Sequence, residues 1–137
     1  MSATEPLVSV EDVSRRFPLD HRDVTAVDHV SLGVWAGEFL AISGPSGSGK
    51  STLLNLIGCI DRPSSGCIRI EGVDAGGLSA ARTRELRRKK IGFVFQTFNL
   101  IPVFTAAENV EYPLLVQAVN GRERRRRVAD TICRAAS

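Results

Sequence analysis

The sequence predicts an α/β fold in which an antiparallel β element lies beside a core sheet. Residues 7–13 and 24–34 roughly alternate apolar and polar side chains, as half-buried antiparallel strands do. Residues 39–42 and 91–95 are short continuous apolar runs, which are typical of strands buried on both faces in an α/β sheet. A glycine-rich loop and a helix-forming segment follow the first of these runs.

The first half of the chain shows clear boundaries between its elements. Gly37 and Glu38 predict a turn before the apolar run 39–42. Residues 51–57 contain no helix breaker and predict a helix, and residues 61–66 predict a turn. The alternating segment 67–71 then predicts a further strand, and two glycines at 76 and 77 end this unit.

The second half predicts three helices and the strand 91–95. Ser79 is a candidate N-cap for a basic helix that continues to Lys90. Thr105 and Glu108 form a capping box at the start of the next helix, which we expect Pro113 to kink or end. After a turn at Asn120 and Gly121, the last helix carries its apolar side chains on one face, at Val128, Ile132 and Cys133.

Length and composition indicate one folded domain over residues 1–137. With 43% hydrophobic residues the chain is not expected to be disordered. No apolar run reaches the ~18–20 residues of a membrane span. The first six residues lack the basic and apolar stretches of a secretory signal, so we expect a soluble protein or the soluble part of a larger one. The spacing of Cys59, Cys67 and Cys133 favours reduced thiols over a disulfide framework or a metal site.

Basic residues gather in two segments, 82–90 and 122–134, which hold 12 of the 18 lysines and arginines and only three acidic residues. Such clusters can bind nucleic acid. However, no aromatic residue is interleaved with the arginines, so the side chains on which bases stack are missing. We therefore interpret both segments as solvated helix faces and expect no nucleic-acid partner. The nucleic-acid alternative predicts binding with a steep dependence on salt concentration.

The chemistry of the chain is concentrated at residues 44–51, which match the phosphate-binding loop motif G-x-x-x-x-G-K-S/T. Its glycines let successive backbone N–H groups face one anion, and the following helix directs its positive end to the same phosphates. Lys50 is expected to bridge the β- and γ-phosphates, Ser51 to ligate Mg²⁺, and Thr52 to reach the α-phosphate. The residues expected to bind nucleotide in this segment are Gly44, Pro45, Ser46, Gly47, Ser48, Gly49, Lys50, Ser51 and Thr52.

Five blocks of sequence, at residues 44–58, 61–66, 91–102, 105–110 and 112–115, resemble the ATP-binding subunits of ABC transporters. Within that family the chain is most similar to the lipoprotein-releasing and macrolide-export branch. The resemblance implies the N-terminal portion of an ABC-type P-loop NTPase domain, with ATP and Mg²⁺ as cofactors. It also implies coupling of ATP binding and hydrolysis to transmembrane export.

The resemblance assigns roles to two further residues. Phe17 occupies the position of an aromatic side chain that stacks on adenine, although a core phenylalanine at a strand end is the alternative. Gln96 matches a catalytic glutamine that reaches Mg²⁺ and the attacking water, a role that suits an amide because it both donates and accepts hydrogen bonds. A polar residue that merely caps a strand is the alternative for Gln96.

The resemblance also implies partners. Residues 97–110 resemble the segment that lines the groove for a membrane subunit, with apolar contacts from Phe98, Leu100, Ile101 and Phe104. A complete subunit of this family would pair with a second ATP-binding subunit. It would lie in the cytoplasm, peripherally on the cytoplasmic face of the plasma membrane.

Three later motifs of the family do not occur in these 137 residues: Leu-Ser-Gly-Gly-Gln, the apolar run with Asp-Glu, and the switch histidine. Asp61 follows an apolar run but precedes Arg62 rather than glutamate, and His21 and His29 both precede the loop, so we interpret the two histidines as surface residues. We expect nucleotide contact without meaningful turnover from this stretch. A non-hydrolysing remnant that binds only nucleotide or a membrane partner is the alternative. A small GTPase is disfavoured because no Asn-Lys-x-Asp motif occurs.

Overall fold

The computed structural model describes residues 5–19 and 22–135. The chain divides into two compact units, Met1–Arg87 and Arg88–Ser137. The first unit holds the sheet and the phosphate-binding loop, and the second holds two paired helices. His21, which we expected at the surface, lies outside the described residues.

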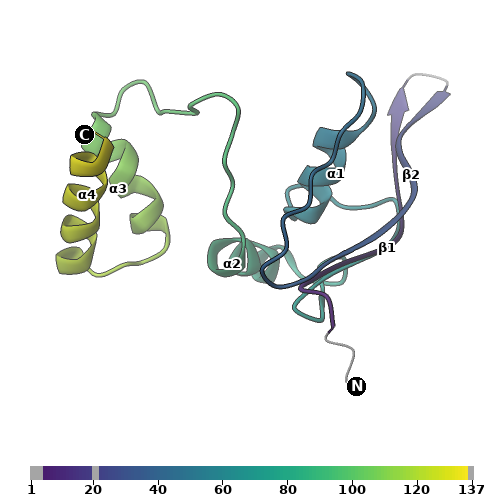
Figure 1. The fold of residues 1–137 in the computed structure, drawn as a ribbon, viewed down its shortest axis with the longest axis horizontal. Coiled ribbons are helices and arrows are strands. Elements are labelled where there is room, and N and C mark those ends of the chain that lie inside the picture. The colour runs from purple at the N-terminus through teal and green to yellow at the C-terminus, as the bar shows by residue number, and fades with distance from the viewer. Residues whose placement is uncertain (1–4, 20–21, 136–137) are drawn as a thin grey trace. The chain divides into compact units, whose positions relative to one another are not determined.

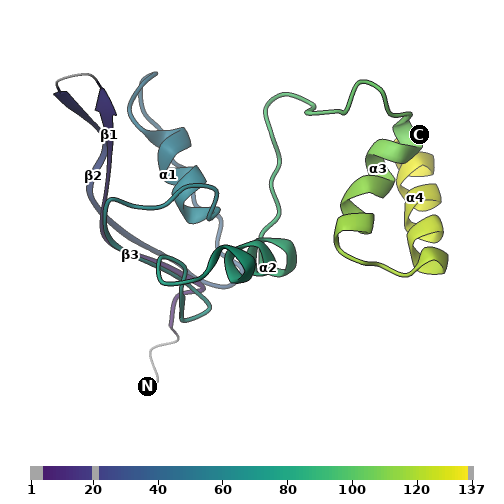
Figure 2. The ribbon, with the colours of Figure 1, turned by 180° about the vertical axis from the view of Figure 1, so that it is seen from behind.

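The first unit is built on a four-stranded antiparallel sheet with strand order β2-β1-β3-β4. Its strands are β1 (Val8–Leu19), β2 (Arg22–Val34), β3 (Ser65–Ile70) and β4 (Val73–Asp74). β1 and β2 form a long hairpin, and β3 runs along the other edge of β1 (Figures 1 and 2). The antiparallel strands expected at 7–13, 24–34 and 67–71 are thus confirmed, whereas the short β4 was not predicted.

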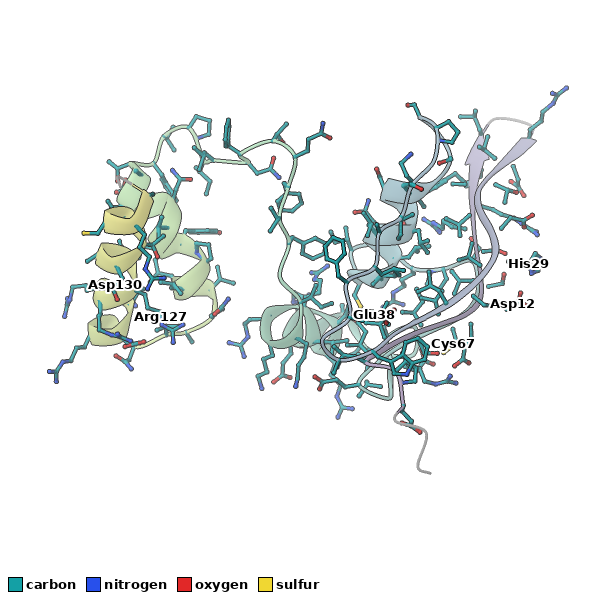
Figure 3. All side chains as sticks on the ribbon, viewed as in Figure 1. Asp12, His29, Glu38, Cys67, Arg127 and Asp130 are labelled. Atoms are coloured by element: carbon teal, nitrogen blue, oxygen red, sulfur yellow. The ribbon has the colours of Figure 1, made fainter. Side chains whose placement is uncertain are left out.

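Irregular pairing interrupts the β1–β2 ladder between Val10 and Arg16. Asp12 and His29 adopt positive φ angles of 51° and 47° there. Their side chains meet on the outside of the hairpin, where Asp12 Oδ1 lies 2.7 Å from His29 Nδ1 (Figure 3). This hydrogen bond, together with the negative charges of Asp12 and Asp28, raises the pKa of His29 above its usual value. His29 is a surface residue, as expected.

Helix α1 (Lys50–Ile57) covers one face of this hairpin and closes the hydrophobic core (Figure 1). Leu53 and Leu56 point from the helix into the sheet, where they pack against four buried apolar side chains: Val10, Val13, Val27 and Ile68. The helix matches the predicted segment 51–57 and begins one residue earlier. Because this core is small, the position of α1 depends on few side chains.

Two expected core strands are not formed. Residues 39–42 and 91–95 have no regular secondary structure, and neither segment pairs with a strand among the described residues. Phe39 is 93% exposed and Val94 is fully exposed. The prediction was wrong because an apolar run supplies only the side chains of a buried strand. The strand itself also requires the backbone of a neighbour and packing on both faces.

The helices after the sheet follow the sequence signals more closely. α2 (Ala80–Lys90) begins after Ser79, whose Oγ accepts from the Arg82 N–H at 3.4 Å, and α2 ends in the second unit. In the second unit, α3 (Ala106–Val116) opens on the predicted capping box of Thr105 and Glu108. Pro113 lies inside α3 and does not end it, because the helix continues to Val116.

The last helix, α4 (Gly121–Ala135), packs side by side with α3 (Figures 1 and 2). Glu123 accepts hydrogen bonds from Arg126 and Arg127, which hold the pKa of its carboxyl at about 2. Arg124 pairs with Glu111 of α3 at 2.6 Å. Val128 is half-buried, whereas Ile132 and Cys133 of the predicted apolar face are exposed. Several of the arginines therefore form ion pairs within this unit.

We expect the seating of α1 to dominate the stability of the first unit. Leu56 is 1% exposed and Leu54, two positions earlier, is 52% exposed. Leu56→Ala should therefore lower the free energy of unfolding by about 2–5 kcal/mol because it leaves a cavity in the core. Leu54→Ala, the matched control, should change it by less than about 1 kcal/mol. Urea unfolding followed by far-UV circular dichroism measures both, and equal losses would contradict this packing.

Candidate functional site

The phosphate-binding loop takes its shape from three glycines with positive φ angles. Gly44, Gly47 and Gly49 have φ values of 151°, 81° and 83°. Side chains other than glycine rarely adopt these angles, so the backbone path requires glycine at these positions. The resulting loop curls around the start of α1, and Ser48 N–H donates to the Pro45 carbonyl at 3.3 Å to close a turn.

Gly49 seats this loop on the sheet. A Cβ atom at Gly49 would lie 2.0 Å from the carbonyl oxygen of Ala26 in β2, a distance that no side chain can occupy. A Cβ atom at Gly47 would meet nothing within 4 Å. The loop therefore rests its back against β2 at Gly49 and presents its open side at Gly47.

Lys50 places its ammonium group against the loop backbone. Its Nζ donates to the carbonyl oxygens of Gly44 at 2.9 Å and Pro45 at 2.6 Å, and it lies 3.3 Å from Ser48 Oγ. These three contacts hold one positive charge beside the loop. An anion seated in the loop would find this cation close by and would replace its carbonyl contacts, because hydrogen bonds between ionised groups are stronger than those to neutral carbonyls.

The N-terminus of α1 adds further groups that favour an anion. Gly49 caps the helix without a side-chain hydrogen bond, and no acidic residue occurs in the first turn. The N–H groups of a first helical turn have no acceptor within the helix, and the helix dipole places positive charge there. Ser51 is exposed and Thr52 half-buried on this turn, while Pro45 and Ser46 lie exposed in the loop. The residues that the sequence predicts to bind nucleotide, Gly44 to Thr52, thus form the loop and the first turn of α1.

A cavity of about 450 Å³ lies between the loop and β2. Residues 25–28 of β2 line one side, and Gly44, Pro45 and residues 48–50 line the other. Its walls combine apolar side chains with the backbone and ammonium groups described above. This mixture of an apolar lining with a few convergent polar groups is typical of small-molecule sites.

Phe17 belongs to the hairpin that borders this cavity. It pairs across the strands with Val24, the residue before the cavity-lining Thr25. Phe17 is 37% exposed and does not belong to the buried core of the described residues, and its role toward adenine stays a prediction. The guanidinium of Arg15 lies 4.5 Å from the centre of the Phe17 ring.

The loop after α1 docks on β1 beside these residues. Arg15 Nε donates to Asp61 Oδ2 at 2.9 Å, and Ser64 N–H donates to the Ser14 carbonyl at 2.8 Å. Ser64 Oγ also accepts from the N–H of Arg16 at 3.0 Å. The sequence of residues 61–66 predicts only a turn and does not indicate these contacts. These side-chain contacts join positions 46 and 48 residues apart, so no local sequence pattern signals them.

Gln96 belongs to the second unit and is exposed in the segment between α2 and α3. Gln96 and the phosphate-binding loop thus belong to different units, and the role of Gln96 toward Mg²⁺ stays a prediction. Nor does a strand end at Gln96, so the alternative of a strand-capping residue loses its basis.

Asn109 holds the segment after Gln96 in place, a role that no sequence motif indicates. Asn109 Oδ1 accepts from the Ile101 N–H at 2.7 Å. Its Nδ2 lies 3.0–3.2 Å from three carbonyl oxygens, those of Ile101, Phe104 and Thr105. Phe104 packs on Tyr112 with ring centres 5.9 Å apart, while Phe98 and Leu100 are exposed. No sequence motif distinguished this asparagine from a solvent-exposed residue on α3.

The chain is similar in sequence to a known protein family and to several of its members. The family model described as ABC transporter matches residues 27–136. The chain is 44% identical over 126 residues to the ABC transporter ATP-binding protein YvrO of Bacillus subtilis, covering 92% of this chain and 55% of that protein. It is 45% identical over 130 residues to the macrolide export ATP-binding/permease protein MacB of Burkholderia thailandensis, covering 95% of this chain and 20% of MacB.

The chain is also similar in fold to a solved structure of an ATP-binding cassette. The ATP-binding cassette MJ0796, in a dimeric post-hydrolysis state bound to ADP and Pi, matches with a TM-score of 0.83 at 44% identity, over 90% of this chain and 54% of that one. The protein MJ0796 comes from Methanocaldococcus jannaschii. The α/β fold class is thereby confirmed for the N-terminal portion of such a cassette. The chain spans about half the length of YvrO and MJ0796.

The contact between Gly49 and β2 predicts a difference between two glycines of the loop. Gly49→Ala and Gly47→Ala both place alanine at a positive φ angle, which costs about 1–2 kcal/mol. Only Gly49→Ala also drives a Cβ atom into the Ala26 carbonyl. We expect Gly49→Ala to lower the free energy of unfolding by about 1–3 kcal/mol more than Gly47→Ala, measured in urea. If Gly47→Ala were the more damaging change, the loop would not rest on β2 through Gly49.

Proposed function

Because this chain belongs to the ABC transporter family, we propose that residues 1–137 form the N-terminal part of an ATP-binding domain that binds Mg-ATP through residues 44–52. The observation that carries the proposal is the glycine loop at the N-terminus of α1 with the Lys50 ammonium held against it. Backbone N–H donors, a helix N-terminus and one lysine form an arrangement suited to a polyphosphate. The bound ADP and Pi of MJ0796, a protein of the same family, support this assignment.

Some of the loop residues would bind the phosphates, and Ser51 would bind the metal ion. Lys50 would exchange its contacts with the carbonyls of Gly44 and Pro45 for the β- and γ-phosphates. The backbone of Gly47 and Gly49 would face the same phosphates, and Thr52 would reach the α-phosphate. The exposed Ser51 hydroxyl would hold Mg²⁺, since oxygen donors suit this cation. When bound, Mg²⁺ neutralises charge on the phosphate oxygens.

Two further residues complete the proposed site. Phe17, exposed on the hairpin beside the cavity, would stack on the adenine base. Gln96 would contact Mg²⁺ and the attacking water in the assembled subunit, and its amide can donate and accept at once. The support for Gln96 is its place in the block of residues 91–102 that resembles the family.

We further propose that the domain couples ATP binding and hydrolysis to transmembrane export by a membrane subunit. MacB, a relative at 45% identity, joins an ATP-binding and a permease part under one name. The apolar segment with Phe98 and Leu100 would contact the membrane subunit, and Asn109 would keep it ordered. A second ATP-binding subunit would complete the site, as the dimers of MJ0796 suggest.

The proposed location is the cytoplasmic face of the plasma membrane, where such a domain would meet both ATP and its membrane partner. Among the helices of the described residues, none has the length and apolar character needed to cross a bilayer.

Substitution of Lys50 tests the proposal. Lys50→Ala should weaken Mg-ATP binding by at least about tenfold, because it removes charge-assisted hydrogen bonds to the phosphates. Lys90→Ala, which removes the same charge at the end of α2, should change the dissociation constant by less than about twofold. Isothermal titration calorimetry of the full chain measures both values. An unchanged dissociation constant in Lys50→Ala would refute the proposed site.

A further inference from the structure

We propose that Arg15 is a positioning residue for the nucleotide base: anchored by Asp61, it holds the ring of Phe17 so that the opposite face of the ring stacks on a purine. The inference rests on the proposed function, because it takes Phe17 as the platform for the base. It adds Arg15 to the proposed site and Asp61 as the residue that fixes Arg15. It also connects the phosphate-binding helix to the residue that stacks on the base.

Arg15 and Phe17 are two positions apart on β1, and the contact between their side chains places both on the same face of the strand. The guanidinium carbon of Arg15 lies 4.5 Å from the ring centre, within the distance at which a cation is attracted to the π electrons. The cation covers one side of the ring. The remaining exposure of Phe17 leaves surface for a second planar group.

Asp61 fixes the position of Arg15. Its Oδ2 accepts from Arg15 Nε at 2.9 Å, and both side chains are largely shielded, at 24% and 31% exposure. Asp61 is itself fixed, because its Oδ1 accepts from the Arg62 N–H at 2.8 Å and its own N–H donates to the Asn55 carbonyl at 3.2 Å. Asn55 belongs to α1, so the anchor of Arg15 is attached to the end of the phosphate-binding helix.

Ser64 strengthens this attachment from the other end of the same loop. Its N–H donates to the Ser14 carbonyl, and its hydroxyl bonds the backbone of Arg16. Arg15 lies between Ser14 and Arg16, the two residues that Ser64 contacts. One helix of eight residues therefore presents the phosphate-binding loop at its start and, through residues 61–64, holds the strand with Arg15 and Phe17 at its end.

This arrangement favours an electron-rich heteroaromatic ligand. A ring that is already ordered loses less conformational freedom when a base stacks on it. The cation also draws π electrons of Phe17 toward itself, which leaves the opposite face better suited to a purine. Stacking reads no base edge, so adenine and guanine nucleotides should benefit alike.

The test compares a nucleotide with its phosphate chain alone. We would titrate Arg15→Met with Mg-ATP, Mg-GTP and Mg-tripolyphosphate, using Arg16→Met as the charge-matched control on the neighbouring residue. Arg15→Met should weaken both nucleotides by about three- to tenfold and leave tripolyphosphate within twofold. Arg16→Met should leave the ratio of the ATP and tripolyphosphate dissociation constants unchanged.

A double-mutant cycle separates positioning from a general effect of charge. Because Arg15 acts through Phe17, Arg15→Met should cause no further loss of ATP affinity in a Phe17→Ala background. Arg15→Lys should restore part of the affinity. Asp61→Asn keeps Arg15 but removes its anchor, so it should reproduce the selective loss of nucleotide affinity. This second variant tests the positioning role even if Arg15→Met unfolds locally. Amide spectra of each variant check that it is folded.

The outcomes distinguish this inference from the proposed function. Equal loss of ATP and tripolyphosphate in Arg15→Met, or additive losses in the cycle, would overturn the positioning role. ATP binding that depends on Lys50 but not on Arg15 or Phe17 would overturn it and leave the proposed phosphate site intact. If the chain showed no Lys50-dependent binding of either ligand, the proposed function and this inference would fall together.

Discussion

The contact between α1 and the β1–β2 hairpin is the constraint on which the rest of the first unit depends. Leu53 and Leu56 bury the helix against the sheet, and Gly49, the N-cap of the helix, lies against the backbone of β2. These contacts fix where the positive end of the helix points. They also fix the loop after the helix, which docks on β1 through Asp61 and Ser64. One small core therefore positions both the phosphate-binding groups and the exposed aromatic ring of the hairpin.

The second unit orders its exposed apolar segment by different means. Hydrogen bonds replace a hydrophobic core there: Asn109 binds the backbone at Ile101, Phe104 and Thr105, and the capping box of Thr105 and Glu108 fixes the start of α3. A side chain that satisfies several backbone groups can hold a loop that has few buried contacts. Phe98 and Leu100 stay exposed next to this ordered segment, a combination suited to an interaction surface.

The sequence predicted best where a single local rule decides the structure. The phosphate-binding loop, α1, the capping box and the alternating strands all follow from patterns within a few residues. Prediction failed at residues 39–42 and 91–95, because a buried strand depends on neighbours that its own residues do not specify. It also missed the contacts of Asp61 and Asn109, since nothing in the local sequence shows which distant backbone a short polar side chain will meet. Family resemblance supplied the proposed roles of Phe17 and Gln96, which the geometry alone does not assign.

We propose that one helix presents a phosphate site and a base platform as a single unit. Amide chemical shifts of the full chain, recorded during titration with Mg-tripolyphosphate and then with Mg-ATP, test it most directly. Tripolyphosphate should shift the amides of residues 44–52, and ATP should shift these together with the amides around Phe17 and Val24. Shifts confined to the arginine-rich segment 122–134, or a loop that does not respond to either ligand, would contradict it.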